Sequence, residues 1–240
     1  MTAARPRRTR RRIVPLALAG LVVGPVVGWA AYAGVTWLRF GREPAHGGAD
    51  PLMERYMPRY DIAEVHRTSV AAPAEVTHAA AREMDLNQSP VVRGIFRARE
   101  LMLRAEPPPR PAHLPLVTEL LSIGWGVLEE VPGRQIVFGA VTQPWEANVV
   151  FRALPPERFA SFDSAGYVKI VVTFAADPLG PQSSRFRTET RAMATDPASR
   201  ARFRRYWSVF SPGILLIRWQ SLSLVRREAE RRAAAQHIAR

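Results

Sequence analysis

The stretch EVHRTSVAAPAEV, residues 64–76, runs from a strand-like segment into the start of a helix. Residues 60–70 carry several β-branched side chains, which favour strands, and they are followed by two small alanines. Pro73 suits the first turn of a helix, and Glu75 would lie near the positive end of that helix. We therefore predict a strand over 60–70 and a helix over 73–83 directly after it.

A second helix is predicted over 89–104. Ser89 is a suitable N-cap, and Pro90 would occupy the first helical position. Apolar residues then recur at helical spacing, at Val92, Ile95, Phe96 and Leu103. Residues 106–115 contain five prolines and predict an extended loop.

Beyond the proline loop the apolar pattern indicates strands. We predict strands over 117–130 and 135–141, joined by a turn at Val131-Pro132-Gly133-Arg134. Two longer strands are predicted over 167–176 and 185–194. Apolar residues alternate along the third strand, at Val168, Ile170, Val172 and Phe174, and polar residues along the fourth, at Arg185, Arg187, Glu189 and Arg191. One face of the sheet is therefore expected to be apolar and the other solvated.

The C-terminal part is predicted to be helical. Asp196-Pro197 begins one helix, Ser211-Pro212-Gly213 is expected to interrupt it near Phe210, and a last helix spans 214–236. In that last helix apolar residues follow one stripe and arginines supply most of the polar surface. Such an amphipathic helix needs an apolar surface to pack against.

This order of elements resembles the START-like superfamily, also called SRPBCC, which includes lipid-transfer domains and polyketide cyclases. The resemblance covers residues 56–236 and depends on residues 64–76, on LEEVPGRQIVFG at 128–139, on TETR at 188–191 and on the long terminal helix. It implies an α+β helix-grip fold, with a curved antiparallel sheet around the C-terminal helix. These motifs mark the fold more than an activity.

The resemblance also implies a cavity between the sheet and the terminal helix, which would bind a hydrophobic small molecule or lipid. The aromatic and aliphatic residues expected to line it are Trp125, Phe138, Phe174, Trp207, Ile217 and Trp219. The same side chains would equally serve as core, because aromatics on apolar faces usually do. Two further functions stay open: a cyclase or hydrolase that uses the same cavity, and a scaffold without a ligand.

No catalytic group can be named from the sequence. His66, His78 and His113 lack the close spacing of a metal site, and no nucleophile elbow, phosphate-binding glycine loop or HExxH motif occurs. No metal or cofactor is therefore expected. His66 is interpreted as a surface histidine and Arg191 with Glu189 as an exposed pair, while Glu119 and Glu146 are placed either at the cavity mouth or at solvated strand ends.

The N-terminal region predicts a membrane segment. Residues 1–12 hold six arginines, and residues 13–38 are uncharged, which corresponds to a helix of about 39 Å against a hydrocarbon core of about 30 Å. An uncleaved transmembrane helix over 13–38 is favoured, because Tyr32 and Trp37 would suit the membrane interface. A cleaved signal peptide is the alternative, with Ala31-Tyr32-Ala33 as its cleavage pattern.

The charge distribution orients that helix. Cations before the span outnumber those after it, so the N-terminus is expected in the cytoplasm and the domain, after a linker over 39–55, outside the cytoplasmic membrane. Residues 1–42 carry eight arginines and no acid, so only +5 of the formal +13 charge belongs to the other 198 residues. A nucleic-acid partner is therefore not expected. The absence of cysteine excludes disulfides, and the oligomeric state is left undetermined.

Overall fold

A five-stranded antiparallel sheet forms the centre of the computed structural model, which describes residues 27–41, 50–106 and 114–238. The strand order is β1-β5-β4-β3-β2, so the first strand of the chain pairs with the last one. The strands are β1 (Ile62–Val70), β2 (Gly126–Val131), β3 (Gln135–Thr142), β4 (Val168–Gly180) and β5 (Ser183–Ala194).

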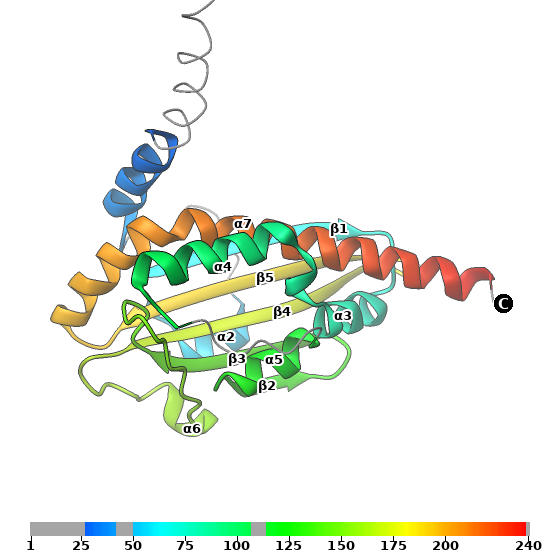
Figure 1. Cartoon of the computed structure of the whole chain (residues 1–240). Coiled ribbons are helices and arrows are strands. Elements are labelled where there is room, and N and C mark those ends of the chain that lie inside the picture. Colours follow the sequence, from blue (N-terminus) through cyan, green and yellow to red (C-terminus); the bar gives the residue numbers. More distant parts are fainter. Residues whose placement is uncertain (1–26, 42–49, 107–113, 239–240) are drawn as a thin grey trace, which may run out of the picture.

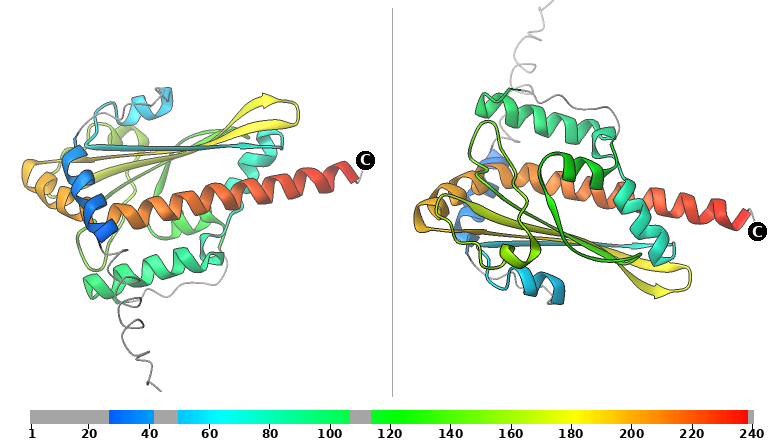
Figure 2. Two further views of the ribbon diagram at one scale, coloured as in Figure 1. Left: turned by 90° about the horizontal axis from the view of Figure 1, so that it is seen from above. Right: turned by 90° about the horizontal axis from the view of Figure 1, so that it is seen from below.

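Helices cover both faces of this sheet, as Figures 1 and 2 show. The long C-terminal helix lies along one face, together with α3, α4 and α5, and the short α2 lies on the opposite face. The helices are α2 (Pro51–Tyr56), α3 (Ala74–Glu83), η1 (Leu86–Gln88), α4 (Pro90–Leu103), α5 (Leu116–Ser122), α6 (Pro156–Phe159) and α7 (Pro197–Ile238). The expected α+β architecture, with an antiparallel sheet packed against a long terminal helix, is confirmed.

The junction that opens the fold is also confirmed. β1 ends at Val70, and α3 begins at Ala74 with Pro73 as its N-cap residue. The backbone N–H of Val92 donates to Ser89 Oγ, so Ser89 caps α4 as its position predicted. Local signals of this kind decide the fold reliably, because capping and proline geometry depend on near neighbours only.

The strand predicted over 117–130 is wrong in its first half. The chain instead forms α5 and then β2, with a β-bulge between Val127 and Glu129. Gly124 separates the two elements with φ of +100°, a conformation that favours glycine. Leu116, Val117 and Leu120 have helical spacing and pack towards the core, so the apolar run in this segment has the period of a helix.

The predicted interruption of the terminal helix is also wrong, because α7 continues through Pro212. Proline removes one hydrogen bond and bends a helix. In Figure 1 the axis of α7 changes direction within its orange part. The buried residues Phe203, Trp207 and Val225 lie on both sides of the proline, so packing along the sheet holds the helix together.

Residues 27–39 form a helical segment that lies across the orange part of α7 (Figure 2). The Arg204 guanidinium lies 4.1 Å from the centroid of the Trp37 ring, and Phe40 packs edge-on against Phe203. Residues 13–26 of the predicted membrane helix fall outside the described residues. Among the helices of the described part of the chain, none meets the length and hydropathy needed to span a bilayer.

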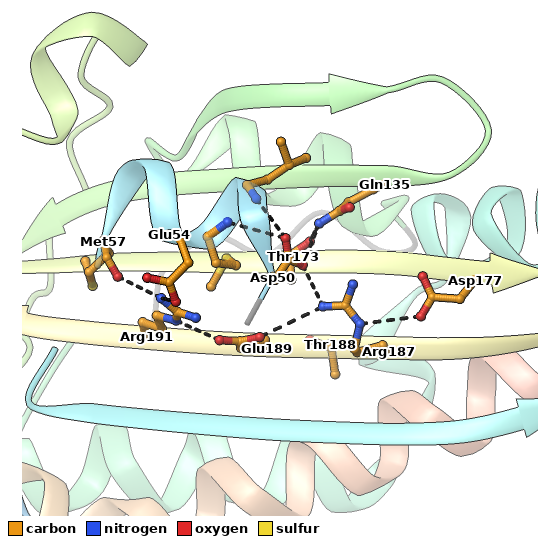
Figure 3. Close-up of polar contacts among 12 residues, drawn as sticks. Asp50, Glu54, Met57, Gln135, Thr173, Asp177, Arg187, Thr188, Glu189 and Arg191 are labelled. Carbon is orange, nitrogen blue, oxygen red and sulfur yellow. Dashed lines mark hydrogen bonds and ion pairs between the residues drawn. The ribbon is translucent and has the colours of Figure 1, made fainter. Parts of the chain in front are cut away.

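The part of the outer sheet face that lies under α2 is buried rather than solvated (Figure 3). Glu189 and Arg191 on β5 are both only 3% exposed, because α2 lies over them, so the predicted exposed pair is wrong. Arg191 Nε lies 2.7 Å from Glu189 Oε1, and Arg191 Nη1 lies 2.8 Å from Glu54 Oε1 of α2. Sequence alternation identified the polar face correctly, but not the helix that buries it.

Candidate ligand-binding cavity

A cavity of about 600 Å³ lies between the sheet and the helices α4 and α7. Its floor is the apolar face of the sheet, with Ile170, Val172 and Phe174 of β4. Pockets of roughly 300–1,000 Å³ with mainly apolar walls are typical of sites for small organic ligands. The size and lining of this cavity are therefore those of a binding site for an apolar molecule.

The position of α4 leaves this space open. α4 packs chiefly against α7 and not against the sheet, and Gly213 of α7 permits the contact, since a Cβ there would lie 3.0 Å from Ile95 Cγ2. A space therefore remains between α4 and the sheet. Gly94, Ile95 and Met102 of α4 consequently form one wall of the cavity.

Four of the six residues predicted to bind a ligand line the cavity. Trp125, Phe174, Trp207 and Ile217 all contribute to its wall. Trp125 comes from the connection between α5 and β2, Phe174 from β4, and the other two from α7, so the fold brings together residues that are up to 92 positions apart in the sequence.

The other two predicted residues lie elsewhere. Phe138 is fully buried in the core, with its ring 5.8 Å from that of Phe174, and it does not reach the cavity surface. Trp219 is 62% exposed on the far side of α7. Trp219 is two positions from Ile217, which places the two side chains on different sides of the helix.

Several lining residues were missed by sequence reasoning. Trp29 comes from the N-terminal helical segment, and Tyr206 and Phe210 come from the first half of α7. The signal for Arg218 was present, because it lies four residues after Ile214 and three before Ser221, within the buried stripe of the helix. It was instead counted with the polar surface.

A compact polar group interrupts the apolar lining. Thr188 and Thr190 of β5 and Arg218 of α7 line the cavity, and Glu64 and His66 of β1 lie beside the two threonines. The strand register sets this arrangement, because Glu64 pairs with Thr190 and His66 with Thr188. These four strand residues form a square of polar side chains on the inner face of the sheet.

Burial changes the acid–base properties of this group. His66 is not a surface histidine, since its side chain is 12% exposed, and burial together with the Arg218 charge lowers its pKa to about 4. Burial raises the pKa of Glu64, while the charges of Arg218 and Arg39 act in the opposite direction. Burial also lowers the pKa of Arg218 to about 10, so this guanidinium stays charged at neutral pH.

The remaining candidate catalytic residues do not meet at the cavity. Glu119 and Glu146 do not line it, and His78 is buried in α3, where burial lowers its pKa. His113 lies outside the described residues. No three potential metal ligands come together in the described ranges 27–41, 50–106 and 114–238.

One side of the cavity opens towards exposed apolar residues. Trp29, Val91 and Met102 both line the cavity and are exposed, by 40%, 43% and 60%. These three residues, which we call the mouth residues, come from the N-terminal segment and from the two ends of α4. The mouth is therefore apolar, and one of its residues, Trp29, belongs to the predicted membrane segment 13–38.

Comparison with known proteins gives similarities at the level of structure. No protein-family model and no curated protein matches the chain. One similar solved structure is that of the di-domain ARO/CYC BexL from the BE-7585A biosynthetic pathway, with 14% identity over 70% of this chain and a TM-score of 0.32. The chain spans 46% of the length of BexL.

Two further solved structures are similar to this chain over nearly their whole length. Protein CV1439 from Chromobacterium violaceum shares 14% identity over 70% of this chain and 97% of its own, with a TM-score of 0.31. Zhui aromatase/cyclase from Streptomyces sp. R1128 shares 14% identity over 71% of this chain and 94% of its own, with a TM-score of 0.25.

Proposed function

We propose that this protein binds a hydrophobic small molecule or lipid in the cavity between its sheet and α7. The observation that carries the proposal is the cavity of about 600 Å³ with largely apolar walls. Trp125 and Trp207 stand at its wall and do not fill it, which argues against a scaffold without a ligand. Burial of apolar surface in such a site contributes about 25 cal/mol per Å² of surface removed from water.

We further propose that the protein is tethered to the cytoplasmic membrane by residues 13–38, with its domain on the outer side. The basic residues 1–12 and the uncharged residues after them support this tether. The helical segment at 27–39 overlaps the C-terminal part of this stretch, carries exposed apolar side chains that include Tyr32 and Trp37, and supplies the mouth residue Trp29. A tether at this place would present the mouth to a lipid surface.

The ligand proposal is tested by native mass spectrometry of the full chain, before and after lipid is added. Bound lipid is expected in the wild type. Val172→Trp places a bulky side chain in the cavity and should abolish binding, whereas Val150→Trp, at a 60% exposed position outside the lining, should leave it unchanged. A wild-type protein that stays empty under all conditions would refute the proposal.

The tether is tested separately with a reporter fused to the C-terminus and with protease added to intact cells. Protection of the domain, or reporter activity inside the cell, would contradict the proposed orientation. Because this experiment does not depend on the ligand, each proposal can fail alone.

A cyclase or hydrolase is a second candidate, and the half-buried pair of Glu64 and His66 favours it. Their side chains approach to 3.9 Å between Glu64 Oε2 and His66 Nε2, and both have shifted pKa values beside the cavity. If the protein converts its ligand, Glu64→Gln and His66→Gln variants should retain a different molecule from the one retained by the wild type. Identical bound molecules in all three proteins would favour binding alone.

A further inference from the structure

Arg218 is the feature of the cavity that binding of an apolar molecule leaves unexplained. Its guanidinium extends from α7 towards the sheet, where Nη1 lies 3.4 Å from Thr188 Oγ1. Its Nε atom is inaccessible to solvent and has no hydrogen-bond partner in the described part of the chain. A buried charge with unused donors is costly, so a group that binds it would stabilise the protein.

No carboxylate in the described ranges forms an ion pair with Arg218. Glu64 is the acid whose charge acts on it, but no ion pair between the two is present, and the close neighbour of Glu64 is His66. Arg187 and Arg191 of β5, on the opposite face of the sheet, differ in this respect, because each contacts carboxylates. Arg218 alone among these three has its charge directed to the cavity.

Further acceptors and donors surround the same place. Thr190 lines the cavity and its buried Oγ1 has no partner among the described residues, and the same holds for Nε2 of His66. Thr188 and Thr190 are two residues apart on β5, so both hydroxyls are on the inner face, below Arg218. The cavity therefore has one polar corner with a cation and two hydroxyl groups, while its other walls are mostly apolar.

Arg99 is the second cation that lines the cavity, and it is already used. Its guanidinium donates to the backbone oxygens of Pro144 and Glu146, at 3.4 and 3.3 Å, and Nε lies 3.5 Å from the Tyr206 hydroxyl. These contacts hold Arg99 against the loop after β3. Arg218 has no comparable set of acceptors.

We propose that the natural ligand is an amphipathic carboxylate, with its apolar part in the cavity and its carboxylate bound by Arg218 beside Thr188 and Thr190. This inference rests on the proposed ligand-binding function and adds the chemical class of the ligand. A planar guanidinium can donate two parallel hydrogen bonds to a carboxylate, and the adjacent hydroxyls can donate to the same oxygens. The long apolar walls account for the rest of the molecule.

The test compares three probes with the same ten-carbon chain and different head groups: decanoate, decanol and decyltrimethylammonium. The full chain is held in an amphipathic polymer at about pH 8, where decanoate is ionised, and affinities are measured by calorimetry. Wild-type protein should bind decanoate about tenfold or more tightly than decanol, and decyltrimethylammonium least tightly, because hydrogen bonds to charged groups are strong.

Arg218→Met should reduce the affinity for decanoate to that for decanol and leave the affinity for decanol unchanged. Arg99→Met and Arg227→Met are the controls, one at the other cationic position of the lining and one on the exposed surface of α7, and both should retain the preference for decanoate. Arg218→Gln replaces the methionine variant if that variant does not fold. Binding of the probes to the polymer is the same for all variants and cancels.

The outcomes separate this inference from the proposed function. If wild-type protein binds none of the probes, the ligand-binding function itself fails. If it binds decanol and decanoate equally, or prefers the cationic probe, the function stands and the carboxylate inference is overturned. Loss of the preference in Arg99→Met but not in Arg218→Met would also overturn it.

Discussion

Asp50 Oδ2 lies 2.6 Å from Arg187 Nη1, so the residue that caps α2 is tied directly to the middle of β5. The same carboxylate oxygen accepts a hydrogen bond of 2.8 Å from Gln135 Nε2, and Oδ1 accepts from the N–H groups at the start of α2 (Figure 3). Asp50 thus joins a helix and two strands. The chain that enters the domain is attached to the sheet at this residue.

Replacing Arg187 should destabilise the fold strongly. Arg187→Met leaves the Asp50 carboxylate, which is 1% exposed, without its charged partner, and loss of one member of a buried pair typically costs about 3–5 kcal/mol. Chemical denaturation should show this decrease in the free energy of unfolding. Arg55→Met removes the exposed pair with Glu129 and should leave the denaturation midpoint almost unchanged; equal effects of both variants would contradict the interpretation.

Asp50 should also make the fold sensitive to acid. Burial alone would raise the pKa of Asp50, but the hydrogen bond and charge of Arg187 outweigh burial, and the pKa lies below its ordinary value of 3.8. As the pH falls, the unfolded chain is protonated first, so stability that is complete above about pH 4 is lost as the pH drops through the folded value. Asp50→Asn should reduce this loss in acid denaturation curves, and the exposed Asp163→Asn should not.

His66 should produce a second pH dependence at higher pH. Its pKa is about 4 in the folded protein, against 6.5 in the unfolded chain, mainly because it is buried. The unfolded state therefore binds more protons between these values, and stability should fall by up to about 3 kcal/mol as the pH decreases from 6.5 to 4. His66→Gln should flatten the curve over this range, whereas the exposed His237→Gln should reproduce the wild-type curve.

Two glycines should respond to alanine in opposite directions. Gly124 has φ of +100°, and a Cβ there would clash with the carbonyl oxygen of Phe151, so Gly124→Ala should destabilise the fold by about 2 kcal/mol or more. Gly94 lies within α4 with open space around it, so Gly94→Ala should stabilise the helix by about 0.5–1 kcal/mol. Thermal denaturation of both variants checks this pair, and a shift of the same sign in both would count against the backbone explanation.

The sequence predicted the elements whose signals are local. The end of β1, the start of α3 and the capped start of α4 depend on Val70, Pro73 and Ser89 and on their immediate neighbours. The first half of the strand predicted over 117–130 is the helix α5, because its apolar residues have helical spacing and pack onto the core, and the prediction did not use that period. Pro212 misled for a similar reason, since contacts on both sides of it outweigh the local cost of the proline.

The candidate site shows the same division. Trp125, Phe174, Trp207 and Ile217 were expected at the cavity because the START-like resemblance implies a cavity between sheet and terminal helix, and all four line the one that is present. Phe138 and Trp219 have the same residue chemistry, but the first is enclosed by the core and the second faces outward. Whether an apolar residue reaches a cavity depends on the distance between layers, which residue type does not encode.

By itself, the sequence determined the α+β class, the alternation of the two sheet faces and the helical C-terminus, since hydrophobic periodicity and capping act over a few residues. Only the tertiary structure decided that α4 leaves a cavity of about 600 Å³, that α2 buries Arg191 and that Arg218 of α7 lies near enough for its charge to act on His66 of β1. These features arise from strand register and from helices that pack against residues far away in the sequence. Contacts between residues so far apart leave no pattern within a short stretch of sequence.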